Sequence, residues 1–120
     1  RCLAETFGLG RLSGFAKSAG DKKVLDMVRC LLLRPKVLLL DEPMAGLALD
    51  ARETVIEFIR ALARTGAVSV VIVEHDLNVI WQLSDHVHFM AEGRVMLQGA
   101  PEEIRQHEIV VQKYVGGGHV

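Results

Sequence analysis

Apolar residues recur at the spacing of one helical face in two stretches of the chain, which predicts two amphipathic helices. The first stretch follows Ser18 and carries Val24, Leu25, Val28, Leu31 and Leu32. The second stretch follows Asp50 and carries Val55, Ile56, Ile59, Leu62 and Ala63. Ser18 with Asp21, and Asp50 with Glu53, have the spacing of a capping box, in which each side chain satisfies the other residue's backbone amide. We therefore expect helices that are capped by Ser18 and by Asp50.

Two continuous apolar runs, 37–40 and 68–73, are typical of parallel strands that are covered on both faces. Apolar and polar residues alternate on either side of Glu92-Gly93, which predicts a β-hairpin with one exposed face. The inward residues of this hairpin are Val87, Phe89, Val95 and Leu97. Short helices are expected at 77–83 and from Pro101 onward. This order of elements predicts an α/β domain with a mainly parallel sheet followed by a C-terminal β-hairpin.

Composition narrows the classes of protein to consider. The 120 residues include 14 basic and 15 acidic side chains, so the net charge is -1 and the basic excess of a nucleic-acid binder is missing. No apolar stretch in the sequence approaches the roughly 20 residues that span a bilayer. Cys2 and Cys30 match no metal-ligand spacing and indicate no disulfide framework. The chain begins with Arg1 rather than Met, so we expect it to start inside a longer gene product or to have been processed.

The candidate chemistry lies where the two apolar runs end. The first run ends in Asp41-Glu42, and the second ends in Glu74-His75-Asp76. Ligands of open parallel sheets bind outside the carboxyl ends of the strands. If the two strands are parallel neighbours, His75 therefore emerges at the same edge as the two acids. The alternatives are a helix-entry turn with solvated acids, a structural histidine, and an Asp76 that only caps the next helix.

These motifs resemble those of ABC ATPases. Leu-Leu-Leu-Asp-Glu-Pro at 38–43 is similar to the Walker B motif, and Val-Glu-His-Asp at 73–76 is similar to the switch-histidine loop. Within the family, the subfamily that imports branched-chain amino acids is the most similar. That likeness rests on the residues Asp41 to Leu47, Ser84-Asp85, Gly99 to Ile104 and Tyr114 to Gly117. The resemblance covers essentially the whole chain from the signature region onward.

The resemblance implies a site for ATP and Mg²⁺. It implies that Glu42 polarises the attacking water, that Asp41 supports Mg²⁺ through water, and that His75 senses the γ-phosphate. It also implies a signature motif whose helix end contacts the ATP held by a second ATP-binding subunit. Lys17-Ser18-Ala19-Gly20-Asp21 fits that motif better than Leu12-Ser13-Gly14, because Ser18 caps a helix and lies 23 residues before Asp41. Two departures from the family pattern are Lys17, in place of a leucine, and Ala48, where many members have an aspartate.

The resemblance further implies an architecture and an assembly. The fold would be the C-terminal portion of a three-layer, P-loop NTPase-like (RecA-like) ABC ATPase core. Residues 1–34 would end the helical subdomain, and residues 35–120 would form the C-terminal part of the ATPase core. The partners would be a second ATP-binding subunit, in a homo- or heterodimer, transmembrane permease subunits and, indirectly, a solute-binding protein. The subunit would lie peripherally on the cytoplasmic face of the inner membrane.

The phosphate-binding pattern Gly-x-x-x-x-Gly-Lys-Ser/Thr does not occur in the 120 residues. We therefore expect a fragment of an ABC importer subunit that is inactive on its own. The alternative is a non-catalytic interaction module derived from an ABC ATPase. A third possibility, an ATPase of DNA repair or translation, is disfavoured by the near-neutral charge. His86 and His88 could ligate a metal, but without an evident third ligand an exposed strand face is the favoured interpretation.

Overall fold

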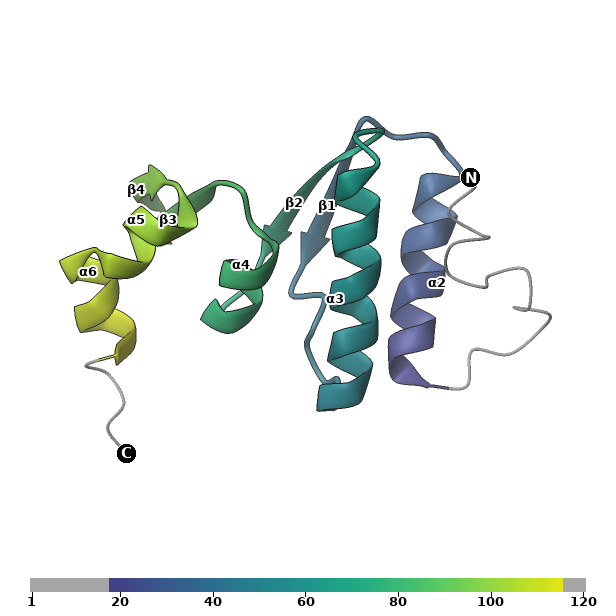
Figure 1. Ribbon diagram of the computed structural model, residues 1–120, viewed down its shortest axis with the longest axis horizontal. Helices are drawn as coiled ribbons and strands as arrows, with labels where there is room; N and C mark the ends of the chain where they lie inside the picture. Colours follow the sequence, from purple (N-terminus) through teal and green to yellow (C-terminus); the bar gives the residue numbers. More distant parts are fainter. Residues whose placement is uncertain (1–17, 116–120) are drawn as a thin grey trace. The chain divides into compact units, whose positions relative to one another are not determined.

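The computed structural model describes residues 18–115, with side chains described for 18–113. The chain divides into two compact units, 1–75 and 76–120, and each is described by itself. In the first unit the elements are α2 (Ala19–Leu31), β1 (Val37–Asp41), α3 (Leu49–Arg64) and β2 (Ser69–Val73) (Figure 1). In the second unit they are α4 (Leu77–Leu83), β3 (Val87–Ala91), β4 (Arg94–Gly99), α5 (Pro101–Gln106), α6 (Glu108–Val110) and the π-helix η2 (Val111–Val115).

The two strands of the first unit pair in parallel, as predicted. Leu38 lies opposite Val70, and the ladder ends where Asp41 lies opposite Val73. Because side chains alternate along a strand, Leu38 and Val70 point to one face of the sheet together with Leu40 and Ile72. Leu38 is buried and the other three are partly buried. The parallel register brings the carboxyl ends of both strands to one edge.

The opposite face of this sheet is exposed, which corrects the prediction of strands covered on both faces. Val37, Leu39, Val71 and Val73 are 51%, 73%, 48% and 60% exposed. The continuous apolar runs did indicate strands, but α3 packs on one side only. No described element of the first unit covers the other side. The described part of this unit therefore presents an open apolar sheet face.

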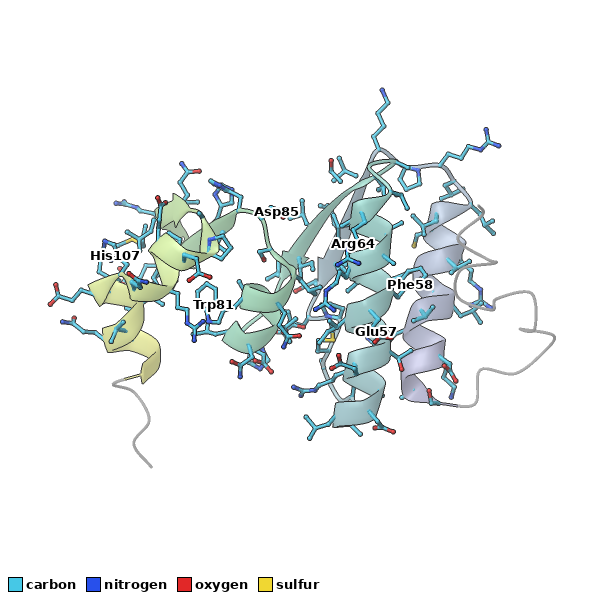
Figure 2. All side chains as sticks on the ribbon, in the orientation of Figure 1. Glu57, Phe58, Arg64, Trp81, Asp85 and His107 are labelled. Carbon is cyan, nitrogen blue, oxygen red and sulfur yellow. The ribbon has the colours of Figure 1, made fainter. Side chains whose placement is uncertain are left out.

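Helix α3 lies between α2 and the strands and forms the centre of the first unit (Figure 1). Its buried side chains occupy a broad stripe, since one helix must pack on two neighbours. They are Val55, Ile56, Phe58, Ile59 and Leu62. Figure 2 shows Phe58 on the side of α3 that faces α2, and this ring is completely buried. Helix α3 thus links the sheet to α2.

The predicted helix starts have different outcomes. Ser18 and Asp21 form the expected capping box, with both side chain to amide distances at 3.1 Å. The second predicted cap is wrong, because α3 begins at Leu49 and its N-cap is Ala48, whose side chain makes no cap hydrogen bond. Asp50 instead lies in the first turn, where a negative charge favours the helix dipole. The sequence analysis also placed Leu32 on the apolar face of the first helix. Instead, α2 ends at Leu31, and Leu32 is 76% exposed.

Gly20 is buried where α2 meets α3. A β-carbon built on Gly20 would lie 2.9 Å from the backbone oxygen of Ala51 and 3.1 Å from the Ala51 α-carbon. These are backbone atoms, so the clash could be relieved only by moving one helix away from the other. Gly20 therefore permits the close approach of the two helix N-termini.

Replacing Gly20 with alanine is expected to lower the free energy of unfolding by about 1–2 kcal/mol, which lies within the range of about 1–3 kcal/mol that is typical of overpacking. The clash must outweigh the roughly 1 kcal/mol that alanine gains in helix propensity. Denaturant unfolding of the whole protein measures the change. Gly99→Ala is the matched control, because its new β-carbon would approach the movable Glu103 carboxylate at 2.8 Å. Equal stability of the Gly20→Ala variant and the wild type would contradict this packing role.

The second unit contains the predicted hairpin with one correction. Glu92 and Gly93, at φ of 53° and 74°, form the tight turn between β3 and β4. Phe89 pairs with Leu97, but Met90 pairs with Val95, so a β-bulge leaves Met96 as the extra residue. The bulge moves Val95 to the same face as Met90, and Val95 is 50% exposed rather than inward. Alternation along the strand could not reveal this extra residue.

The core of the second unit consists of Phe89, Ile104 and Val110, with Trp81 packed against it. Trp81 is thus a half-buried core residue. Among residues 18–115 the strands form a two-stranded parallel sheet and a separate two-stranded antiparallel sheet. The α/β class is confirmed. In the same range, no helix has the length and apolarity needed to cross a membrane.

Candidate functional site at the ends of β1 and β2

The chain leaves β1 and β2 at the same sheet edge. The amide of Glu42 donates to the Val73 carbonyl at 2.8 Å, which extends the parallel pairing one residue beyond β1. Asp41 and Glu42 therefore stand directly beside the residues that follow Val73. This is the edge at which parallel sheets bind ligands.

Glu42 has an unusual backbone conformation. Its φ is 45°, in the left-handed region that costs a residue with a β-carbon about 1–2 kcal/mol. The turn that follows is held by hydrogen bonds from the Ala45 amide to the Glu42 carbonyl, at 3.0 Å, and from the Leu47 amide to the Met44 carbonyl, at 3.2 Å. Pro43 and Met44 are buried, whereas Glu42 remains exposed. The turn thus anchors itself in the core and presents the Glu42 carboxylate to solvent.

The structure brings Glu42 and His75 together. The His75 Nδ1 atom lies 3.4 Å from the Glu42 Oε1 atom, and the two side chains are 74% and 52% exposed. A pair this exposed contributes little to stability. Its geometry nevertheless confirms that the acid and the imidazole meet at one edge. Asp41 is exposed at the same strand end.

Glu74 is a residue of this edge that the sequence interpretation missed. Its side chain is only 1% exposed, and its Oε1 atom accepts a hydrogen bond from the Met44 amide at 3.0 Å. The strand period carries the missed signal: Val70, Ile72 and Glu74 alternate toward the covered side of the sheet. His75 follows Val71 and Val73 on the open side. The two glutamates of the edge, Glu42 and Glu74, therefore have opposite environments.

Ser18 and Gly20 lie at the N-terminus of α2, apart from the acid and histidine pair. The helices α2 and α3 begin at the end of the unit toward which both strands point (Figure 1). The Ser18 hydroxyl accepts from the Asp21 amide. Within residues 18–115, no hydrogen bond or ion pair joins Ser18 or Gly20 to Asp41, Glu42 or His75. The competing signature candidate, Leu12-Ser13-Gly14, and Lys17 lie outside the described residues.

Two other candidates have local roles in the second unit. Asp76 caps α4 by accepting from the Asn78 amide at 3.0 Å, as its alternative interpretation proposed. His86 and His88 are exposed, with ring centroids 4.9 Å apart, and the His86 Nε2 atom lies 3.4 Å from the Gln98 Oε1 atom. Within the described part of the chain, no group of three or more potential ligands could hold a metal ion. The exposure of both histidines agrees with the favoured interpretation of an exposed face.

The edge offers oxygen ligands of the kind that Mg²⁺ uses. Mg²⁺ is usually held by one or two carboxylates together with waters and substrate phosphates, rather than by a complete protein cage. Asp41 supplies an exposed carboxylate at a strand end. A single acid without a full ligand group thus fits Mg²⁺ that is shared with a phosphate ligand.

The fold matches solved ATP-binding cassettes. The crystal structure of the ADP conformation of MJ1267, an ATP-binding cassette of an ABC transporter, superposes with a TM-score of 0.77 and 26% identity over 95% of this chain and 47% of that one. CbiO1 from Clostridium perfringens, part of the ABC transporter complex cbiONQ, gives a TM-score of 0.76 and 29% identity over 97% of this chain and 47% of that one. The class defined by the fold is the ABC ATPase-like α/β fold.

Curated relatives point to a particular group within that class. BraF, a high-affinity branched-chain amino acid transport ATP-binding protein of Pseudomonas aeruginosa, is 34% identical over 97 residues, which are 81% of this chain. LivG of Escherichia coli K12, which has the same description, is 32% identical over 97 residues. A comparison with protein-family models gives no match.

The chain is similar to the ATP-binding proteins of ABC transporters, and branched-chain amino acid transport proteins are among its relatives. It spans about 38% of the length of those curated relatives.

Proposed function

We propose that this chain is part of the ATP-hydrolysing subunit of an ABC importer for branched-chain or related amino acids. The observation that carries the proposal is the pairing of Glu42 with His75, at 3.4 Å, where two parallel strands end. Its support from relatives is the similarity to BraF and LivG over most of the chain. The solute itself is not specified by this edge.

Glu42 and His75 have different proposed roles at the reacting phosphate. Glu42, exposed and within reach of the imidazole, polarises the attacking water by accepting its proton. His75 donates to an oxygen of the γ-phosphate or to that water. Both side chains need solvent access for these roles, and both have it.

Asp41 is proposed to hold Mg²⁺ through a water molecule. The bound ion would neutralise charge on the phosphates during transfer. Ser18 and Gly20 are proposed to complete the site of a second ATP-binding subunit, since the backbone amides of a helix N-terminus attract anions. Their separation from Glu42 in the first unit is compatible with a role toward a different ATP molecule.

The larger assembly follows from the same proposal. Residues 1–34 end a helical subdomain, and residues 35–120 belong to the C-terminal part of a three-layer, RecA-like ATPase core. The partners are a second ATP-binding subunit and transmembrane permease subunits, with a solute-binding protein acting indirectly. The subunit lies on the cytoplasmic face of the inner membrane without spanning it.

Asp41→Asn tests the proposed site. The variant is expected to raise the Mg²⁺ concentration needed for half-maximal ATP hydrolysis by the whole protein about 10- to 100-fold, the usual effect of losing an outer-sphere partner. Phosphate release measured across a Mg²⁺ titration gives the value. Asp26→Asn is the control, because Asp26 is an exposed acid of α2 that pairs with Arg29, at 3.3 Å, and has no proposed role at the site. An unchanged Mg²⁺ requirement in Asp41→Asn would contradict the role.

One observation favours a second candidate function, a non-catalytic interaction module. The open sheet face of Val37, Leu39, Val71 and Val73 offers apolar area for contact with another protein. A module of this kind would not hydrolyse ATP in any assembly. ATP hydrolysis by the whole protein, lost on changing Glu42, separates the two functions in favour of the ATPase.

A further inference from the structure

We propose that Glu74 is a positioning residue that fixes the Glu42 turn and thereby holds the Glu42 carboxylate against His75. This inference rests on the proposed ATPase function and adds a residue to its machinery. Glu74 is the one acid of this strand edge whose side chain is buried, at 1% exposed. A buried carboxylate is retained only where hydrogen bonding offsets its loss of water.

The hydrogen bond of Glu74 reaches across the two strand ends. Its Oε1 atom accepts from the Met44 amide at 3.0 Å, and Met44 lies two residues after Glu42 and 30 positions before Glu74. Hydrogen bonds from a backbone amide to a carboxylate are among the stronger ones in proteins. Because Met44 is itself buried, the contact ties an interior point of the turn to the residue that immediately precedes His75.

Three contacts then connect the same two segments. The Glu42 amide binds the Val73 carbonyl at 2.8 Å, the Met44 amide binds Glu74 at 3.0 Å, and His75 Nδ1 lies 3.4 Å from Glu42 Oε1. The last of these joins two exposed side chains and is weak. The two contacts made by backbone amides hold the chain at Glu42 and at Met44, and they compensate for the left-handed backbone of Glu42. Removing the Glu74 contact would leave the turn free to relax and to carry the Glu42 carboxylate away from the imidazole.

Glu74 is placed to orient rather than to react. Its buried carboxylate has no solvent access for a substrate water, unlike that of Glu42. Its Oε2 atom lies 4.0 Å from His75 Nδ1, farther than Glu42 Oε1 does. The closer partner of the imidazole is therefore Glu42, and the effect of Glu74 passes through the backbone of the turn.

Two substitutions of Glu74 separate the effect of its side-chain length from the effect of its charge. Glu74→Asp keeps the charge but withdraws the carboxylate by one methylene, whereas Glu74→Gln loses the charge and keeps an oxygen that can accept from the Met44 amide. In ATP hydrolysis by the whole protein, Glu74→Asp is expected to lower kcat about 10- to 100-fold with KM for ATP unchanged within about twofold. Glu74→Gln is expected to retain kcat within about threefold. Equal losses in both variants, or no loss in Glu74→Asp, would overturn the proposal.

A second measurement does not depend on turnover. Hydrogen exchange of the Met44 amide is expected to be at least about tenfold faster in Glu74→Asp than in the wild type, and unchanged in Glu74→Gln. Nuclear Overhauser contacts between the Glu42 side chain and the His75 ring are expected to weaken in parallel. Persistence of these contacts in Glu74→Asp would overturn the positioning role even in a protein without ATPase activity. Absence of hydrolysis by the wild type, with these spectroscopic changes present, would instead count against the proposed function alone.

Discussion

Changing Glu42 to glutamine is expected to lower kcat for ATP hydrolysis by the whole protein about a thousandfold. General-base catalysis contributes about 10²–10⁴-fold to a rate, and the amide of glutamine cannot accept the proton of the attacking water. The side chain keeps its size, so the turn and the nucleotide affinity should be retained. Phosphate release and nucleotide binding, measured on the same preparation, give the two quantities.

Glu57→Gln is the matched control for this experiment. Glu57 is exposed on α3, and the same chemical change there removes no proposed catalytic group (Figure 2). Its kcat should equal that of the wild type. Turnover by Glu42→Gln at the wild-type rate would show that another group activates the water, and the assignment of Glu42 would have to be abandoned.

Changing Phe58 to alanine is expected to lower the free energy of unfolding by about 3–5 kcal/mol, the usual cost of truncating a core phenylalanine. Phe58 is completely buried on α3, the helix that packs against both α2 and the sheet. Its removal leaves a cavity whose walls belong to separate elements and cannot easily close. Denaturant unfolding followed by circular dichroism measures the loss.

Leu39→Ala is the control for Phe58→Ala. It also truncates a large apolar side chain, but Leu39 is 73% exposed on the open sheet face. Its effect on the free energy of unfolding should stay below about 1 kcal/mol, because little apolar area leaves the interior. A comparable loss in both variants would mean that the open face is covered in solution, for example by a second copy of the chain.

The meeting of Glu42 and His75 could be predicted because it depends on strand direction alone. Two apolar runs joined through a helix are typical of a βαβ unit, in which the strands pair in parallel and end at one edge. The assignment of roles to the two glutamates could not be made in the same way. Glu42 and Glu74 both lie within two residues of the end of an apolar run, and only the pleat and the course of the 42–47 turn decide which acid is buried.

Other differences have equally local causes. The β-bulge at Met96 turns the Val95 side chain to the opposite face of the hairpin. No residue type in that strand marks an inserted position. The cap expected at Asp50 is replaced by Ala48, since α3 starts earlier than its acidic residues indicate. Gly20 was interpreted only as part of the signature motif, whereas the contact with Ala51 gives it a packing role as well.

The left-handed backbone at Glu42 lowers the stability of the fold, whereas the carboxylate at this position is needed for the proposed chemistry. Glycine adopts a φ of 45° without the strain that a β-carbon brings, so a glycine there should relieve about 1 kcal/mol. Selection for stability alone would therefore favour glycine over glutamate at position 42. A copy of this protein without the proposed ATPase role would therefore be more stable with glycine than with glutamate at position 42.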